Sequence, residues 1–338
     1  MSAEASRPAG AYGVVADADE TRLIERYFAR LGPVRADVGL GIGDDAALLR
    51  PQNGCELVMT TDTLVEGSHF LPGADAHSLG HRAMAVNLSD IAAMGADPCW
   101  ALLSLTMPTV DHAWLEAFCT GFGAQLHAHA VALVGGNLAR GPLNIGVQLC
   151  GQAPVGEALT RTGAHSGDLI CVSGTVGDAA AGRELAPSSV TSAEAALGRL
   201  RQRFNYPQAR VSLGRQLRGL ASACIDVSDG LWRDLSRLVR GSGCGANVVA
   251  EDLPMSAALR EVAGERALEF ALQGGEDYEL LFTLPPARLP ALRAAALETS
   301  TAFTVIGACD ASGALRLQQA GVTRQPGAGG FDHFLLPG

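Results

Sequence analysis

Hydrophobic and polar residues in the first half of the chain follow two patterns, one typical of helices and one typical of strands. The predicted helices cover 20–31, 76–94 and 111–130. The predicted strands cover 56–64, 99–108, 131–136 and 144–152. Gly95 and Pro98 end the second helix, and Asp111 caps the start of the third. The pattern predicts a unit in which helices and strands alternate.

The second half repeats this mixture of elements. We expect a strand at 167–174, a short helix at 177–186 and a strand at 277–284. The stretch 221–243 predicts a strand, a turn and a helix, with Gly241 or Gly243 as the C-cap. A further helix, two short strands and a tail complete the chain. The segment 186–198, rich in Ala and Ser, is predicted to be a linker or a mobile loop.

Domain organisation follows from these elements and from length, since 338 residues are enough for about two domains. We expect a loose tail at 1–19, an N-terminal domain at 20–150 and a C-terminal domain at 151–338. The predicted fold class is α+β or α/β, with the two domains facing a shared cleft.

Composition excludes several classes of function. The net charge of −10 argues against nucleic-acid binding. No apolar run is long enough to cross a membrane, and the N-terminus does not resemble a signal peptide. Eight cysteines without a CxxC pair indicate a reduced, cytoplasmic protein. All 25 basic residues are arginine, so the Walker A lysine and Schiff-base chemistry are excluded.

Acidic residues gather after glycine turns and predicted strands. They occur in "GIGDDAALL" (41–49), "TTD" (60–62), "NLSD" (87–90), "DVSD" (226–229) and "GGED" (274–277). Taken singly, Asp229 could cap a helix, Asp90 could pair on a helix surface, and Asp44 and Asp45 could form an ordinary turn. Taken together, carboxylate and hydroxyl oxygens from several segments suit Mg²⁺, which proteins hold through a few carboxylates and substrate phosphates.

Paired glycines supply a second element of the predicted site. "VALVGGN" (131–137) and "LQGGED" (272–277) place Gly-Gly pairs where backbone N–H groups can approach a phosphate. Such pairs are also common in hairpins. Arg161 is a candidate phosphate ligand, or a surface arginine. The residues thus favour nucleotide or phosphate chemistry that depends on magnesium.

Nine stretches, in this order, resemble the thiamine-monophosphate kinase family of the aminoimidazole ribonucleotide synthase-like superfamily. They are "GIGDDAALL", "TTDTLVEGSHF", "AVNLSDIAAMGADP", "VGGN", "LTRTGAHSGD", "VSGTVGDAAAG", "DVSDGL", "GGEDYELLFT" and "GFDHF", which span about 20–334. The resemblance implies ATP-dependent phosphorylation of thiamine monophosphate to thiamine diphosphate. It also implies an N-terminal sheet that pairs across a homodimer and a C-terminal α/β domain that closes the nucleotide cleft.

The resemblance implies roles for individual residues. The implied magnesium ligands are Asp45, Thr60, Thr61, Asp62, Asp90, Asn137, Asp226 and Asp229. The implied ATP contacts are Gly136, Asn137, Arg161 and Ser228. The implied contacts with thiamine monophosphate are His69, Glu276 and Phe331. Three positions depart from the family: Asn137 replaces a common Asp, Phe331 replaces a common Trp, and no aromatic residue stands at Thr120.

The implied chemistry needs no general base. The acceptor is a phosphate monoester with a second pKa of about 6, so its oxygen is largely ionised at pH 7. Magnesium ions would neutralise the repulsion between the two polyanions, and in-line transfer then requires mainly positioning. Three alternatives remain open: an ATP-dependent synthase that acts on a carbonyl or amide, a metal-dependent phosphatase or other hydrolase, and a non-enzymatic module that binds metal or nucleotide.

Overall fold

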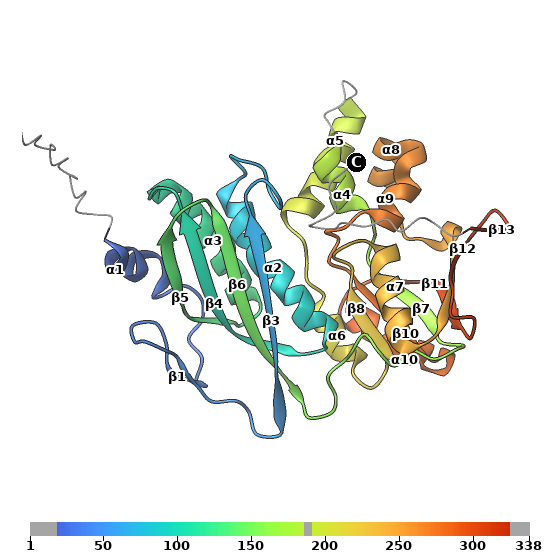
Figure 1. Ribbon diagram of the computed structural model, residues 1–338, viewed down its shortest axis with the longest axis horizontal. Coiled ribbons are helices and arrows are strands. Elements are labelled where there is room, and N and C mark those ends of the chain that lie inside the picture. The colour runs from blue at the N-terminus through green and yellow to red at the C-terminus, as the bar shows by residue number, and fades with distance from the viewer. Residues whose placement is uncertain (1–18, 186–190, 325–338) are drawn as a thin grey trace, which may run out of the picture.

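The N-terminal half of the protein is a four-stranded sheet covered on one face by two helices. The computed structural model describes residues 19–185 and 191–324 (Figure 1). The strand order is β3-β6-β4-β5. The strands are β3 Cys55–Val65, β6 Asn144–Pro154, β4 Asp97–Met107 and β5 Ala132–Arg140. β4 and β5 are parallel, and the other pairs are antiparallel.

The two covering helices, α2 (Ala76–Ala93) and α3 (His112–Ala128), pack closely against each other. A Cβ atom added at Gly80 would lie 2.1 Å from the carbonyl oxygen of Phe118. One added at Gly121 would lie 2.0 Å from the carbonyl oxygen of His77. Glycine is therefore required on both helices where their backbones approach. α3 provides the crossover between β4 and β5, and the carboxylate of Asp111 accepts hydrogen bonds from its first turn.

The C-terminal half is built on a seven-stranded, mainly antiparallel sheet with the order β13-β12-β9-β11-β7-β10-β8. Its strands are β7 Leu169–Ser173, β8 Ala223–Asp226, β9 Gly245–Val249, β10 Leu280–Leu284, β11 Phe303–Asp310, β12 Leu315–Gln319 and β13 Val322–Arg324. Its α-helices are α4 Asp178–Glu184, α5 Thr191–Asn205, α6 Val211–Leu217, α7 Leu231–Ser242, α8 Ala257–Ala263, α9 Ala267–Gln273 and α10 Leu289–Glu298. α4, α5, α8 and α9 gather at one end of this half and share a small hydrophobic core (Figure 1).

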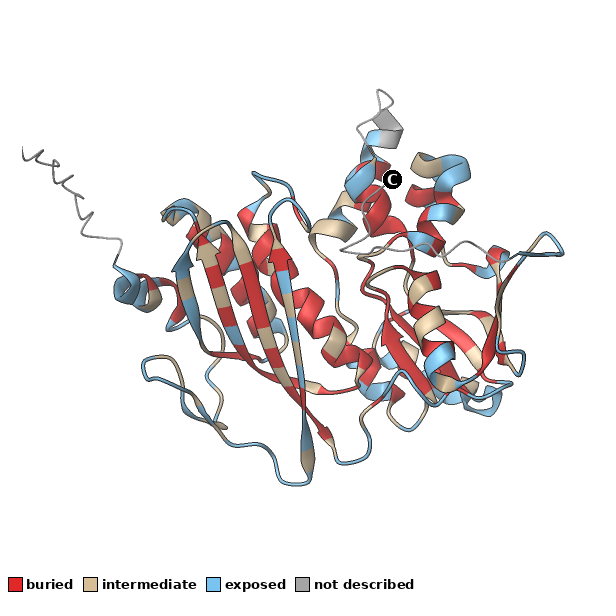
Figure 2. Cartoon of the chain, in the orientation of Figure 1, coloured by how far each residue is buried: buried red, intermediate tan, exposed pale blue. Residues whose placement is uncertain are grey.

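Helix α2 lies between the two sheets and is almost entirely buried (Figure 2). It packs against β3 and β6 on one side and against β8 and α6 on the other. One hydrophobic core therefore includes residues of both halves, among them Leu88 of α2, Leu213 of α6 and Phe282 of β10. The shared core fixes how the two halves are placed relative to each other.

Short elements precede the first sheet. α1 (Glu20–Leu23) continues into a π-helix, η1 (Ile24–Phe28), so the helix predicted at 20–31 is shorter than expected. The strands β1 (Val38–Leu40) and β2 (Leu48–Leu49) flank the acidic turn of "GIGDDAALL". Within the described residues, no helix is both long enough and apolar enough to span a bilayer.

Several predicted elements are wrong. The predicted linker at 186–198 contains the start of α5, which is helical from Thr191; residues 186–190 lie outside the described residues. The strand predicted from 277 begins at Leu280, because Glu276 and Tyr278 have φ values of +73° and +52°. The last part of the chain forms β11, β12 and β13 rather than two strands, and β9, α6, α8 and α9 were not predicted. The tail predicted at 1–19 lies outside the described residues except for its last residue. The motif "GFDHF" lies wholly outside them.

Candidate phosphoryl-transfer site

Helix α2 brings together three of the acidic segments. The amide oxygen of Asn87 accepts a hydrogen bond from the backbone N–H of Asp62, at 3.1 Å. The next turn carries Asp90, whose carboxylate accepts a hydrogen bond from the hydroxyl of Thr60. Ser89 Oγ donates to the carboxylate of Asp226 at 2.7 Å, across the boundary between the two halves. The motif "NLSD" therefore connects β3 with β8.

Asp62 was expected to end the strand "VMTTD", but it lies inside β3, as does Thr60. Asp90 lies within α2, and Asp226 is the last residue of β8. The carboxylates are thus supplied by a strand interior, a helix and a strand end. Their proximity is a result of the packing of α2 between the sheets.

The grouped carboxylates disfavour each other's ionisation. Burial, with the nearby charges of Asp90, Glu276 and Asp229, raises the pKa of Asp62 to about 7. Burial likewise raises the pKa of Asp90, although the Thr60 hydroxyl and the Arg161 guanidinium act in the opposite direction. Burial and the neighbouring Asp90 raise the pKa of Asp226 well above its usual value.

A cavity of about 390 Å³ opens beside this acidic cluster. Five of the residues predicted for the site line it: Asp62, His69, Ser228, Asp229 and Glu276. The opposite wall consists of residues of α4, η3 (Gly264–Arg266) and α9, including Arg183, Arg266 and Phe270. The cavity therefore lies between the N-terminal half and the helical end of the C-terminal half.

In the loop "GGEDYE" (274–279), four residues line the cavity: Gly274, Gly275, Glu276 and Tyr278. The hydroxyl of Tyr278 donates to Glu276 at 3.0 Å. Glu276 and Tyr278 have positive φ values, an uncommon conformation for residues other than glycine. Their backbone N–H groups donate to the carbonyl oxygens of Ser228 and Val227. The loop is thus paired directly with the turn that follows β8.

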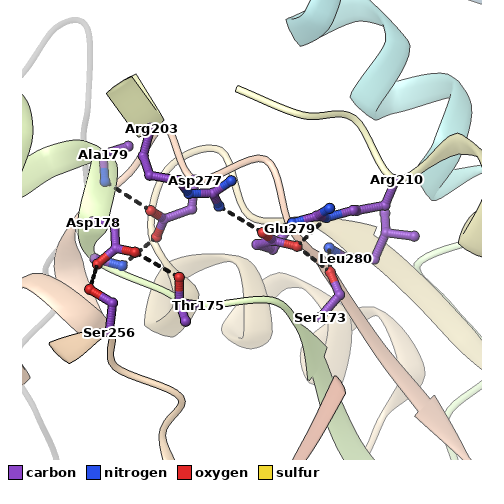
Figure 3. Close-up of polar contacts among 11 residues, drawn as sticks. Ser173, Thr175, Asp178, Ala179, Arg203, Arg210, Ser256, Asp277, Glu279 and Leu280 are labelled. Carbon is purple, nitrogen blue, oxygen red and sulfur yellow. Dashed lines mark hydrogen bonds and ion pairs between the residues drawn. The ribbon is translucent and has the colours of Figure 1, made fainter. Parts of the chain in front are cut away.

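Behind the wall, Asp277 and Glu279 anchor the loop in the interior (Figure 3). Asp277 accepts hydrogen bonds from the backbone N–H groups of Gly177 and Ala179, at 2.6 and 3.2 Å. Glu279 is fully buried between Arg203 and Arg210, with N–O distances of 2.7 and 2.6 Å. These contacts fix the unusual backbone conformation that presents Glu276.

The turn after β8 has its own internal support. The backbone N–H groups of Ser228 and Asp229 donate to the carboxylate of Asp234 in the first turn of α7. Asp229 also forms an ion pair with Arg237 at 2.7 Å. Asp229 is therefore held by a basic partner as well as facing the cavity.

Gly243 is the C-cap of α7, with a φ of +72°. It is one of the two residues that were predicted as alternatives for this cap.

Three predicted site residues lie elsewhere. Asp45, Gly136 and Asn137 line a second, larger hollow of about 1130 Å³, on the sheet face that α2 and α3 leave open. Asp44 accepts a hydrogen bond from the N–H of Asp45, so the carboxylate of Asp44 is engaged within the turn that these two residues were expected to form. Gly135 and Gly136 lie inside β5, not at its end as predicted.

Thr61 is exposed on β3, on the strand that also carries Thr60 and Asp62. Arg161 is exposed in the loop that joins the two halves. Phe331 lies outside the described residues. The implied roles of these residues stay predictions.

The donor set suits Mg²⁺ in part. Within residues 19–185 and 191–324, no three His, Cys, Asp or Glu side chains are grouped closely enough to hold a metal ion by themselves. Magnesium in phosphoryl-transfer enzymes is usually bound through one or two carboxylates together with waters and substrate phosphates. The crowded carboxylates of Asp62, Asp90 and Asp226, whose pKa values are raised, supply such partial ligand sets.

Sequence reasoning missed several residues that support the site, namely Arg82, Asn87, Asp234, Tyr278 and Glu279. Arg82, Asp234 and Glu279 are charged residues that the structure buries. Asn87 and Arg82 lie on the α2 sequence that was predicted to be a helix. A charged residue within an apolar helix indicates a buried partner, and this signal was available in "GHRAMAVNLSD".

The architecture and the site belong to a known class of two-domain proteins. Residues 43–153 match the family model of the AIR synthase related protein N-terminal domain, and residues 165–319 match the corresponding C-terminal domain. The second match begins shortly before β7, the first strand of the second sheet.

Similarity over the whole chain gives a narrower assignment. The chain is 46% identical over 322 residues to the thiamine-monophosphate kinase of Salmonella typhimurium, covering 94% of this chain and 99% of that protein. The crystal structure of thiamine-monophosphate kinase from Stenotrophomonas maltophilia has a TM-score of 0.81 and 43% identity, covering 87% and 95% of the two chains. A structure of AaThiL complexed with AMPPCP and TMP has a TM-score of 0.74 and 34% identity, covering 84% and 89%. This chain belongs to the thiamine-monophosphate kinase family.

Proposed function

We propose that the protein transfers the γ-phosphoryl group of ATP to thiamine monophosphate, giving thiamine diphosphate and ADP. The observation that carries this proposal is the shared cavity, where Asp62 and Asp229 lie with His69 and Glu276. Membership of the family supports it, as does the 34%-identical structure described as complexed with AMPPCP and TMP. The acidic residues of the cavity suit phosphates whose charge is neutralised by cations, and its lining also includes two aromatic residues, Phe270 and Tyr278, that could contact an organic ring.

The chain's own residues would act by binding and orientation. Bound magnesium would supply neutralisation of the phosphate charges. Asp62, Asp90 and Asp226 would hold it, assisted by Thr60. The further ligands proposed from the family pattern are Thr61, Asp229, Asp45 and Asn137. No side chain need remove a proton, because the acceptor phosphate is largely ionised at pH 7.

Nucleotide and acceptor would meet at the acidic cluster. Arg161 lies close enough to Asp90 to lower its pKa, which supports the proposal that Arg161 contacts a nucleotide phosphate at the same cluster. Ser228, Gly136 and Asn137 are the other proposed nucleotide contacts, of which Gly136 and Asn137 line the second hollow. His69 and Glu276 line the cavity and are proposed to contact the acceptor, with Phe331 stacking on its ring. The protein lacks lysine, so arginine, backbone N–H groups and cations must neutralise both phosphates.

We further propose that the protein is a homodimer that uses the open face of the first sheet. Leu57, Met59 and Leu102 are exposed there and line the same hollow as Asp45 and Asn137. Pairing of this face would cover the exposed apolar side chains. Met59→Arg should then convert the dimer to a monomer on gel filtration; a wild-type monomer would contradict the proposal.

The remaining assignments concern location and partners. We propose a cytoplasmic protein that binds neither nucleic acid nor membranes, because all eight cysteines are free thiols and the charge is −10.

One assay tests the proposed reaction. ADP release from Mg-ATP is measured with thiamine monophosphate, with thiamine, and without acceptor. We expect release only with thiamine monophosphate and formation of thiamine diphosphate in equal amount. Release without acceptor would indicate a hydrolase, and Mg-ATP binding without release would indicate a binding module. Turnover with a formylglycinamidine-type substrate instead would indicate a synthase.

A further inference from the structure

A buried arginine of α2 contacts two segments of the cavity wall. Arg82 is 2% exposed. Its Nη1 atom donates to the carbonyl oxygen of His69 at 2.9 Å, and its Nη2 atom donates to Oε2 of Glu276 at 2.6 Å. The guanidinium carbon lies 4.1 Å from the centre of the Phe204 ring. One side chain therefore joins a loop of the N-terminal half, the loop 274–279 and helix α5.

The contact with Glu276 crosses the boundary between the two halves. Asp277 and Glu279 hold the loop from behind within the C-terminal half (Figure 3). The carboxylate of Glu276 is held from the front by Tyr278 of its own loop and by Arg82 of the other half. Arg82 thus connects Glu276 with the backbone of His69 and sets the position of one relative to the other.

Arg82 does not line the cavity itself. Both of its terminal nitrogens are engaged, and its Nε atom is buried with no hydrogen-bond partner among the described residues. The guanidinium is enclosed by protein and can influence a ligand only through the groups that it holds. Its position on α2 also matters, because Asp90 lies eight residues further along, about two turns or 12 Å of helix.

We propose that Arg82 is a positioning residue of the acceptor site, which holds Glu276 and His69 at a fixed spacing and links them through α2 to the carboxylates of the acidic cluster. This inference rests on the proposed function, in which Glu276 and His69 contact the acceptor. Loss of Arg82 would then weaken binding of thiamine monophosphate and leave ATP binding unchanged. A purely structural role would weaken both.

A double-mutant cycle tests the proposal. The dissociation constants of thiamine monophosphate and of Mg-ATP are measured by calorimetry for wild type, Arg82→Met, Glu276→Ala and the double variant. We expect Arg82→Met to weaken binding of thiamine monophosphate at least about ten-fold, a value within the range of coupled neighbours. We expect a change of less than about two-fold for Mg-ATP. In the Glu276→Ala background the same substitution should have a much smaller effect.

A matched control is available at the other end of the boundary between the halves. Arg218 of the C-terminal half donates to the carbonyl oxygen of Gly95 at 2.5 Å and to the carboxylate of Asp97 at 2.8 Å. It therefore makes the same two kinds of contact as Arg82, away from the cavity. Arg218→Met should leave both dissociation constants unchanged.

Each outcome is decisive. Additive effects of Arg82→Met and Glu276→Ala, or equal weakening of both ligands, would overturn the proposal. If Arg82→Met does not fold, Arg82→Lys decides the matter. Lysine keeps the charge but cannot make both contacts, so weakening should be intermediate and confined to thiamine monophosphate. Turnover is measured in parallel: a wild type that binds thiamine monophosphate without releasing ADP would refute the proposed reaction and leave the role of Arg82 intact.

Discussion

The raised pKa of Asp62 leads to a measurable conflict between function and stability. In Asp62→Asn the carboxylate is replaced by a neutral group of the same size. The pKa of Asp62 is about 7 in the folded protein, against an ordinary value of 3.8, because of burial and three neighbouring acids. A carboxyl group with a raised pKa in the folded state destabilises the fold as pH rises from about 4 to about 7. Asp62→Asn should remove this loss of folding stability.

The magnitude follows from the shift in pKa. A difference of about 3 pH units, at about 1.4 kcal/mol each, corresponds to about 4 kcal/mol. Asp62 is only partly buried, so water reduces the penalty and this value is an upper limit. We expect Asp62→Asn to be more stable than wild type by about 1 to 4 kcal/mol at pH 8.5 and to differ little below pH 4. The variant should have lost its kinase activity.

Calorimetric unfolding in EDTA at pH 8.5 and at pH 4 measures the effect, with the exposed Asp252→Asn as the control. The experiment is then repeated with Mg²⁺. An ion bound only by the folded state stabilises it. Wild type should gain more from Mg²⁺ than Asp62→Asn does. The reasoning is refuted if Asp62→Asn is less stable than wild type at pH 8.5, or if Mg²⁺ stabilises both proteins equally.

Three further predictions concern the acidic turn, α2 and the buried anchor. Asp90→Ala should lower kcat by at least about 10³-fold while circular dichroism stays unchanged; near wild-type kcat would exclude Asp90 as a metal ligand. Asp45→Asn should cost more activity than Asp44→Asn, because Asp44 is occupied by its own turn; the opposite order in the ADP-release assay would contradict this. Glu279→Ala removes the buried carboxylate that pairs with two partly buried arginines and should lower the free energy of unfolding by about 3–5 kcal/mol in urea titrations; a loss below about 1 kcal/mol would show that Glu279 is not an anchor.

Elements with strong local signals were predictable. The structure confirms the predicted helices as α2 and α3. They were predictable because both carry long apolar patterns and α3 begins at a capping aspartate. It also confirms the strand, turn and helix that place Asp226, Ser228 and Asp229. In these regions the local preference of the residues agrees with the final fold.

Elements that depend on distant partners were not predictable. The segment after residue 190 resembles a polar linker, but α5 is stabilised by packing on α4 and α8. The start of β10 is delayed because Asp277 and Glu279 are drawn into the interior by partners about 70–100 residues away. No local pattern specifies such partners.

The sequence by itself determined the family, the mixed α/β class and the set of oxygen-bearing residues, because each of these is expressed in short, contiguous motifs. Only the tertiary structure decided that the carboxylates come from a strand interior, a helix and a strand end, and that Arg82 and Glu276 meet across 194 residues of chain. The physical reason is that α2 is buried between two sheets. Its polar residues must find partners on both sides, and those partners are chosen by packing rather than by local preference.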